Sequence, residues 1–176
     1  MPSNIEIKAG IQNWSEMESR VKAISDTDAQ KLIQKDIFFN VPNGRLKLRL
    51  FADGSGELIQ YQRPDTQQTK QSQYQIYKTA NPQQLQETLE KALGIWVVVE
   101  KTRNLYHVGQ TRIHMDQVKG LGNFLELEVV LQFNQNPEEG HAIAEYFIQQ
   151  LQVQKSDLID VAYADLLLKK TMQNTR

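Results

Sequence analysis

Residues 100–131 read EKTRNLYHVGQTRIHMDQVKGLGNFLELEVVL, and this stretch contains three consecutive segments in which polar and apolar residues alternate. Successive side chains of a β-strand point to opposite faces of a sheet, so each segment predicts a strand with one charged and one apolar face. Turns at Gly109-Gln110 and Gly120-Leu121-Gly122 separate the segments. The stretch therefore predicts an antiparallel meander with both signs of charge on one side. The charged positions are Lys101, Arg103, Arg112, His114, Asp116, Glu126 and Glu128.

The rest of the chain combines further strands with short helices. Alternation predicts strands over 4–8, 36–41, 45–50, 57–62 and 74–78. Apolar spacing predicts helices over 14–25 and 158–169, and two more begin at Asn81-Pro82 and Asn136-Pro137, where a capping residue precedes proline. Arg63–Ser72 is polar and aperiodic, as in a mobile loop. We therefore predict one α+β domain over residues 1–176, with about eight largely antiparallel strands. Closure into a barrel would remove exposed sheet edges.

The composition excludes several classes of protein. The chain has 176 residues, a formal net charge of -1 and no cysteine. No global basic field attracts nucleic acid or an anionic membrane, and disulfides, thiolate metal sites and cysteine nucleophiles are absent. The N-terminus lacks the pattern of a signal peptide, and no apolar run approaches the length of a membrane span. We predict a cytoplasmic protein that binds neither nucleic acid nor membrane. A homodimer is compatible with the sequence, but no feature requires one.

Familiar catalytic motifs are missing from the sequence. It contains no GxxxxGK[ST] phosphate loop, no complete dinucleotide fingerprint and no GxSxG elbow. The three histidines, His107, His114 and His141, lack the i, i+4 spacing of a helical metal site. What remains is the set of charged strand faces, which includes Glu6 with Lys8 and Arg45 with Lys47 and Arg49.

These charged faces have two interpretations. An antiparallel sheet commonly exposes one face to solvent, where mixed charges form ordinary cross-strand pairs. If the sheet instead closes with these faces inward, buried ions cost several kcal/mol each unless they are paired. A polyanion that carries a hard cation would pair both signs. Arginine and lysine bind phosphate oxygens, and carboxylates are preferred ligands of Mg²⁺ and Mn²⁺. The second interpretation predicts a lumen for a triphosphate and its metal.

The residues resemble the CYTH, or triphosphate tunnel metalloenzyme, superfamily, which includes class IV adenylate cyclases, thiamine triphosphatases and inorganic triphosphatases. The superfamily's first-strand ExExK motif reads Asn-Ile-Glu-Ile-Lys at positions 4–8. The sequence AYADLL at 162–167 is similar to the family's SYxDLL. The later signature EKxRxxY…D…GLGxFxExE is matched by Glu100, Lys101, Arg103, Tyr106, Asp116, Gly120, Leu121, Gly122, Phe124, Glu126 and Glu128.

The resemblance implies a single CYTH-like domain over residues 1–176, folded as a closed eight-stranded antiparallel barrel with helices packed outside. The barrel forms a tunnel for a triphosphate and for Mg²⁺ or Mn²⁺. The implied catalytic residues are Glu6 and Lys8. The implied triphosphate-binding residues are Lys8, Lys47, Arg49, Lys101, Arg103 and Arg112, and the implied metal ligands are Glu6, Asp116, Glu126 and Glu128.

Two positions depart from the family pattern. Asn4 replaces the first glutamate of ExExK, and Gln62-Arg63-Pro64 replaces a lysine before Gly-Pro. That phosphate contact is therefore either lost or supplied by Arg63 through a shift of the strand. The overall look is closest to class IV adenylate cyclase-like (CyaB-type) sequences. We predict a metal-dependent phosphohydrolase acting on a nucleoside, organic or inorganic triphosphate. One alternative is a class IV cyclase that makes cyclic AMP and pyrophosphate from ATP. The other is a non-catalytic nucleotide or polyphosphate binder that lost turnover with the glutamate.

Overall fold

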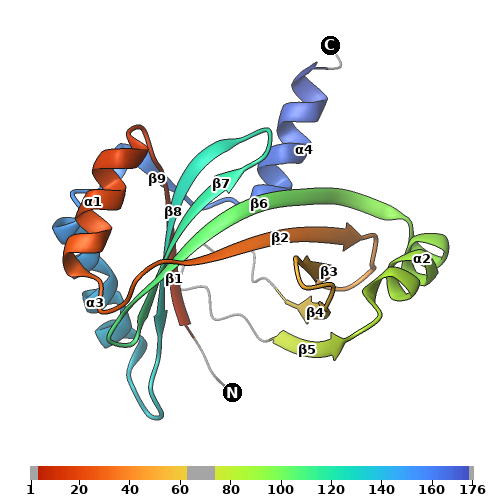
Figure 1. Ribbon diagram of the computed structural model, residues 1–176, viewed down its shortest axis with the longest axis horizontal. Helices are drawn as coiled ribbons and strands as arrows, with labels where there is room; N and C mark the ends of the chain where they lie inside the picture. Colours follow the sequence, from red (N-terminus) through yellow and green to blue (C-terminus); the bar gives the residue numbers. More distant parts are fainter. Residues whose placement is uncertain (1–3, 63–73, 175–176) are drawn as a thin grey trace.

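A single curved antiparallel sheet organises the structure, a computed structural model that describes residues 4–62 and 74–174 (Figure 1). The strand order is β5-β4-β3-β2-β6-β7-β8-β1-β9. The strands are β1 Asn4–Gly10, β2 Gln30–Phe39, β3 Arg45–Phe51, β4 Gly56–Tyr61, β5 Tyr74–Thr79, β6 Ile95–Val108, β7 Thr111–Val118, β8 Gly122–Val130 and β9 Leu158–Ile159. The helices are α1 Trp14–Ile24, α2 Pro82–Leu93, α3 Pro137–Gln150 and α4 Tyr163–Asn174, with a 3₁₀ turn at Lys155–Asp157.

The predicted α+β fold with an antiparallel sheet is confirmed, with nine strands in place of the predicted eight, and the bounds of two elements differ most. β2 begins at Gln30, well before the predicted start at Asp36, because residues 30–35 pair with β6 although each face of this segment has only one apolar residue. The predicted helix over 158–169 is wrong at its start. Leu158 and Ile159 pair with β1, and α4 begins only at Tyr163. The predicted loop at Arg63–Ser72 lies outside the described residues.

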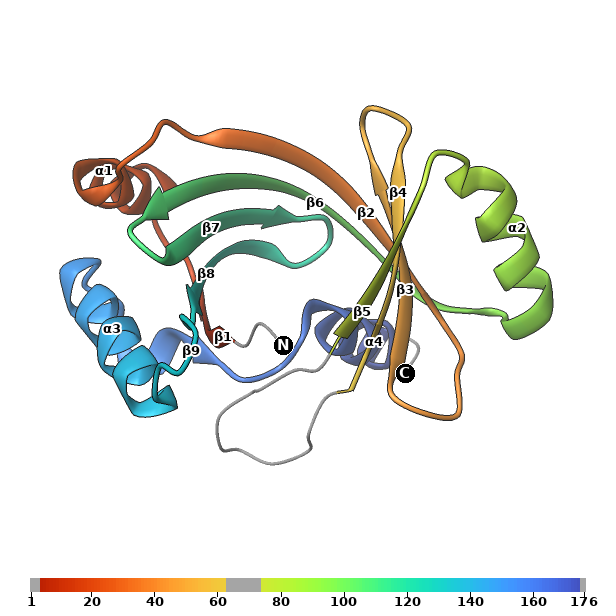
Figure 2. The same cartoon turned by 90° about the horizontal axis from the view of Figure 1, so that it is seen from below.

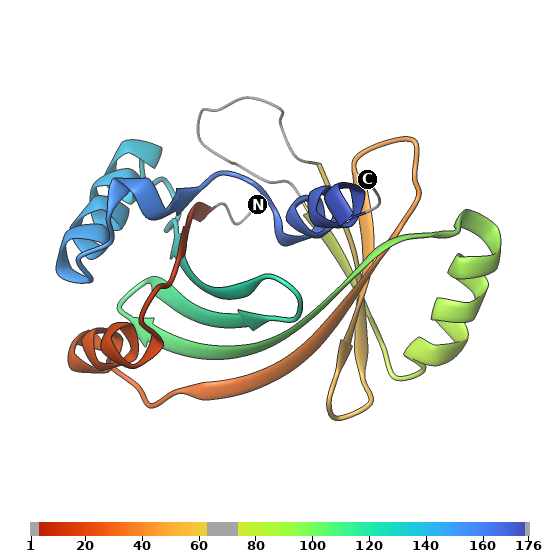
Figure 3. The same cartoon turned by 90° about the horizontal axis from the view of Figure 1, so that it is seen from above.

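The sheet curls around a central space without closing by backbone pairing in the described ranges. Its outermost strands are β5 and β9, and no pairing joins them there. In Figures 2 and 3, α4 lies between the β1 side of the sheet and the β3–β5 arm. Arg45 of β3 binds both carboxylate oxygens of Asp165 in α4 at 2.9 and 3.0 Å. α4 therefore covers the gap that a closed barrel would fill with strand pairing.

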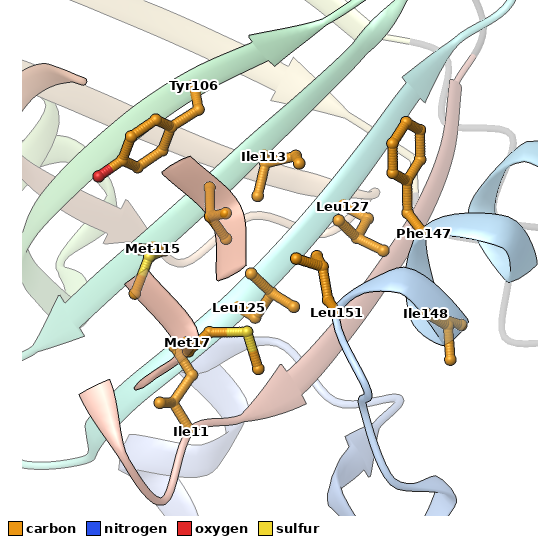
Figure 4. Close-up of a cluster of buried hydrophobic side chains, with 11 residues drawn as sticks. Ile11, Met17, Tyr106, Ile113, Met115, Leu125, Leu127, Phe147, Ile148 and Leu151 are labelled. Carbon is orange, nitrogen blue, oxygen red and sulfur yellow. The ribbon is translucent and has the colours of Figure 1, made fainter. Parts of the chain in front are cut away.

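The apolar faces of the strands are covered by helices on the outside of the curve. Tyr106, Ile113 and Leu127 of the meander pack against Met17 of α1 and Phe147 of α3 (Figure 4). At the other end of the long strands β2 and β6, the leucines of α2 pack near Ile37 and Leu48. No helix in the described ranges combines the length and apolarity needed to cross a bilayer. The opposite face of the sheet carries the charged residues and, beside α4, a second apolar cluster that includes Phe38, Val99 and Tyr163.

Candidate functional site

The charged faces of the strands line a cavity of about 460 Å³ on the concave side of the sheet. Strands β1 to β8 and the start of α4 all contribute side chains to its wall. Among the described residues, six cationic side chains and five carboxylates line it. The cations are Lys8, Lys47, Arg49, Lys101, Arg103 and Arg112, and the carboxylates are Glu6, Asp36, Glu57, Glu126 and Glu128. The inward interpretation of the charges is the one that the fold adopts.

Asp36 of β2 holds two of the cations by cross-strand hydrogen bonds. Its carboxylate accepts from Nε and Nη2 of Arg49 at 2.7 and 2.8 Å and from Nζ of Lys47 at 2.9 Å. Asp36 is 2% exposed. Burial alone would raise its pKa, but the charges of Lys47 and Arg49 outweigh burial and hold the pKa well below its usual range. Asp36 is therefore ionised and fixes both cations on β3 against the cavity wall.

Asp116 of β7 orients Arg103 in the same manner. Its two oxygens accept from Nε and Nη2 of Arg103 at 2.7 and 2.6 Å, and the hydroxyl of Tyr163 donates to it at 2.9 Å. Asp116 is fully buried and does not line the cavity. Burial, together with the carboxylates of Glu126 and Asp116, raises the pKa of Tyr163, so this hydroxyl stays protonated as a donor.

Glu126 and Glu128 of β8 lie opposite β1 and form the acidic wall of the cavity. Cα register pairs Glu6 with Glu128 and Lys8 with Glu126. Glu126 accepts from Arg103 at 3.2 Å and lies 3.6 Å from Nζ of Lys8. Burial opposes its ionisation, but Arg103 and its other basic neighbours hold its pKa well below the usual range. Glu126 is thus a cavity-facing anion, with Glu128 beside it on the same wall.

His114 lies between these two glutamates. Its Nδ1 is 3.0 Å from Glu126, and its Nε2 is 3.7 Å from Glu128. Burial, and then the charge of Arg103, lower the pKa of His114, so the imidazole is neutral at pH 7. A neutral ring with its proton on Nδ1 donates to Glu126 and helps to hold that carboxylate in place.

Lys101 is the exception among the cavity cations. It is 8% exposed, and its Nζ has no hydrogen bond or ion pair with any residue of the described ranges. Its nearest ring contact is with Tyr163, whose centroid is 5.5 Å from Nζ. Burial, and then the charge of Arg103, lower the pKa of Lys101 to about 7. Among the described residues, Lys101 thus faces the cavity without a hydrogen-bonded carboxylate, although the charge of Asp36 acts on it.

The residues around Asn4 fit a hard divalent cation in their chemistry. Glu6 and Glu128 face each other across β1 and β8, where two carboxylates repel unless a cation separates them. The Asn4 amide donates to Glu128, and its buried Oδ1 accepts no hydrogen bond from the described residues. Carboxylate and amide oxygens are the donors that Mg²⁺ and Mn²⁺ prefer. No three acidic or histidine side chains of residues 4–62 and 74–174 converge on one point in this structure.

The structure brings together all six predicted phosphate-binding residues and three of the four predicted metal ligands. Asp116, the fourth predicted ligand, lies behind Arg103 with its oxygens occupied. Arg63 lies outside the described residues. Sequence reasoning missed Asp36 as a counterion, although its place in a strand two positions from Gln34 and Phe38 puts it on the cavity face. His114 and Tyr163 were noted in the sequence without their roles.

Comparison with known proteins gives a match over most of the chain. Residues 3–163 match the CYTH domain. A protein from Methanocaldococcus jannaschii named "Putative adenylate cyclase MJ0240" is 24% identical over 170 residues, which cover 92% of this chain and 97% of that protein.

Solved structures resemble the fold over nearly their full length. The PH1012 protein from Pyrococcus horikoshii superimposes with a TM-score of 0.82 at 21% identity, covering 93% of this chain and 98% of the other. The Hippeastrum protein HpAC1 superimposes with a TM-score of 0.69 at 16% identity, covering 97% and 96% of the two chains. HpAC1 is described as an adenylyl cyclase candidate with a dominant triphosphatase activity.

Proposed function

The chain belongs to the CYTH domain family, and on this premise we propose that it is a divalent-metal-dependent phosphohydrolase that acts on a triphosphate in the cavity. The observation that carries the proposal is the convergence of cations and carboxylates from neighbouring strands of one sheet on one cavity. Such a wall suits a ligand that carries several negative charges and a hard cation.

The near balance of charge in the cavity supports a role for the metal. Most of the cations are already paired with carboxylates, as in the Asp36 and Glu126 contacts. A triphosphate that takes hydrogen bonds from these cations leaves carboxylates without partners, which is costly in a buried site. A divalent cation bound with the triphosphate would pair with Glu6, Glu126 and Glu128. Binding of the triphosphate should therefore depend on the metal.

The predicted binding residues of the wall have separate roles in this proposal. Lys8, Arg49, Lys101 and Arg103 clamp the phosphates, with Lys47 and Arg112 beside them. Asp36 and Asp116 hold Arg49 and Arg103 in a fixed orientation, so little reorganisation is needed when charge develops on the phosphoryl group. Glu6, Glu126 and Glu128 would hold Mg²⁺ or Mn²⁺. When bound, such a metal would neutralise charge on the phosphates and would lower the pKa of a coordinated water.

A second candidate is the class IV cyclase reaction, which the name of the M. jannaschii relative favours. The same phosphate clamp would serve both reactions, because they differ in the attacking group. Water attacks in hydrolysis, and the ribose 3′-hydroxyl attacks the α-phosphate in cyclisation. Hydrolysis asks only that a water be positioned, whereas cyclisation also requires the sugar to be held in one orientation. The description of HpAC1 supports hydrolysis as the main activity.

Product analysis tests the proposal. Purified protein is incubated with Mg²⁺ or Mn²⁺ and with tripolyphosphate, ATP, GTP or thiamine triphosphate, and a parallel set contains EDTA. We expect metal-dependent release of orthophosphate. Cyclic AMP with pyrophosphate from ATP would establish the cyclase instead. Tight binding without product would identify a binding protein, with Asn4 as the first position to revert. An experiment that finds no binding and no product would refute the site.

A further inference from the structure

A second cavity, of about 520 Å³, adjoins the first and shares two lining residues with it, Gln34 and Lys101. Five residues that line the second cavity are cross-strand neighbours in one row across β3, β2, β6, β7 and β8. The row runs Phe51, Gln34, Lys101, Val118 and Gly122, as the Cα register of each strand pair shows. Cross-strand neighbours point to the same face of a sheet. This face is the one that carries the phosphate-clamp residues.

Gln34 is the unusual member of this row. Its side chain is buried, with 5% exposed, and its Oε1 has no hydrogen-bond partner among the described residues. The amide nitrogen also forms no hydrogen bond with any described residue, so both its donor and its acceptor are available at the junction of the two cavities. A buried polar group without partners destabilises a fold, and most buried amides are satisfied. Its neighbour Lys101 feels the charge of Asp36 but forms no hydrogen bond or ion pair with a described residue.

The residues on either side of Gln34 suit a flat ring. Phe51 is its cross-strand neighbour on β3 and presents an aromatic ring. At the far end of the row, Gly122 has a φ of +116°, and a Cβ built there would meet no atom within 4 Å. Leu50 and Val118 add apolar surface to the same cavity. An aromatic ring and an adjacent amide recognise the face and the edge of a heteroaromatic base.

We propose that this row forms the subsite for the heteroaromatic group of an organic triphosphate, with a nucleobase as its prototype. Gln34 hydrogen-bonds a donor and an adjacent acceptor on the edge of the ring, and Phe51 packs against its face. Lys101 lies between this subsite and the clamp around Arg103, where the phosphate chain leads from one cavity to the other. The inference rests on the proposed triphosphate site and specifies its substrate class. It distinguishes nucleoside triphosphates from inorganic tripolyphosphate.

The test compares ligands with and without a base on the same variants. Non-hydrolysable analogues of ATP, GTP, CTP and UTP, thiamine triphosphate and tripolyphosphate are titrated calorimetrically, each with Mg²⁺, into the wild type. Gln34→Met keeps the length of the side chain and removes its amide. Gln75→Met is the matched control, because Gln75 is exposed on β5 and lines neither cavity. Phe51→Leu is the second variant.

We expect the wild type to bind at least one organic triphosphate more tightly than tripolyphosphate. Gln34→Met should weaken that ligand about tenfold or more and change tripolyphosphate by less than about twofold. Phe51→Leu should weaken it several-fold, and Gln75→Met should change neither ligand. The melting temperature of Gln34→Met should be unchanged or higher, because an unpaired buried amide is removed.

Two results would overturn the inference. One is a wild type that binds no organic triphosphate more tightly than tripolyphosphate. The other is a Gln34→Met variant in which both ligands weaken equally or neither changes; if that variant unfolds, Phe51→Leu decides by the same criterion. These outcomes are separate from failure of the proposed function. Efficient hydrolysis of tripolyphosphate alone would refute the base subsite and support the proposed phosphohydrolase. Selective binding of a nucleotide without hydrolysis would support the base subsite and refute the proposed phosphohydrolase.

Discussion

Two kinds of carboxylate surround the cavity, and they differ in what remains available for a ligand. Asp36 and Asp116 are buried and give both oxygens to the arginine that they face. Glu6, Glu126 and Glu128 line the cavity from β1 and β8 and keep part of their surface exposed to it. The comparison indicates that the two kinds of carboxylate have different roles. The aspartates fix the phosphate-binding cations, and the glutamates remain open to a metal.

The largest effect is expected from removal of a buried aspartate. Asp36→Asn leaves Lys47 and Arg49 buried without their counterion, and loss of one partner in a buried ion pair costs about 3–5 kcal/mol. Urea denaturation measures the loss. Glu100→Gln is the control, because Glu100 forms an exposed pair with Lys119 that contributes about 0–1 kcal/mol. An equal, small loss in both variants would contradict the structural role of Asp36.

The same aspartate should make the fold sensitive to acid. The pKa of Asp36 is well below 3.8 in the folded state, so its ion pairs stabilise the fold above the unfolded value. This contribution is lost as the pH falls through the folded pKa. The free energy of unfolding of Asp36→Asn should therefore decrease less than that of the wild type between about pH 4 and pH 2, on a scale of about 1–3 kcal/mol. Parallel acid titrations followed by circular dichroism measure the difference.

An open glutamate should affect the metal more than the fold. Glu126→Gln removes an anion that faces Lys8, Arg103 and His114. We expect at least about tenfold weaker Mn²⁺ affinity, measured by calorimetry in the presence of tripolyphosphate. Asp116→Asn is the informative partner variant. It should disturb Arg103 and triphosphate affinity first, and a larger loss of Mn²⁺ affinity in Asp116→Asn than in Glu126→Gln would reverse the division proposed above.

A gain of metal affinity is expected from Asn4→Glu. The substitution places a carboxylate beside Glu128 where the neutral amide now donates a hydrogen bond. Two adjacent carboxylates repel without a cation, so the variant should be less stable without metal and should bind Mn²⁺ about tenfold more tightly. Turnover that appears only in this variant would show that the wild type is a binding protein. Asn4→Gln, which adds length but no charge, controls for size.

The smallest expected effect is a proton taken up by Lys101. The pKa of this lysine falls from an ordinary value of 10.5 to about 7 in the folded state. Between these limits the unfolded chain binds more protons, so stability rises with pH there. A bound triphosphate would raise the folded pKa. Calorimetry at about pH 8 in buffers of different ionisation enthalpy should show uptake of up to about one proton per triphosphate. Lys101→Met should abolish this uptake, and unchanged uptake would assign it to another group.

The sequence predicted which charged residues share one face of the sheet better than it predicted which side chains they contact there. Glu6, Lys8, Arg103, Glu126 and Glu128 occur in alternating segments, and parity alone puts them on one face.

Asp36 and Asp116 show what parity leaves open. A carboxylate on the cavity face can point to the ligand or to a neighbouring guanidinium, and only the register of adjacent strands decides which. Register places Asp36 opposite Arg49 and Asp116 opposite Arg103, so both aspartates point to a guanidinium. β9 was missed for a different reason, because two residues are too few to show a period.

The position of β1 in the sheet has a consequence for synthesis. β1 is made before every other strand of the sheet, yet its two neighbours are β8 and β9, which are among the last elements to be made. Strands β2 to β7 can pair before the neighbours of β1 have been made. The pairing of β1 with β8 and β9 joins residues far apart in the sequence, and pairing of this kind forms slowly. The order of synthesis therefore allows the wall that contains Arg49 and Arg103 to form during translation, whereas the wall that contains Glu6 and Glu126 can form only near its end. A ribosome stalled before β8 would carry a nascent chain with Arg49 and Arg103 in place and with β1 still unpaired.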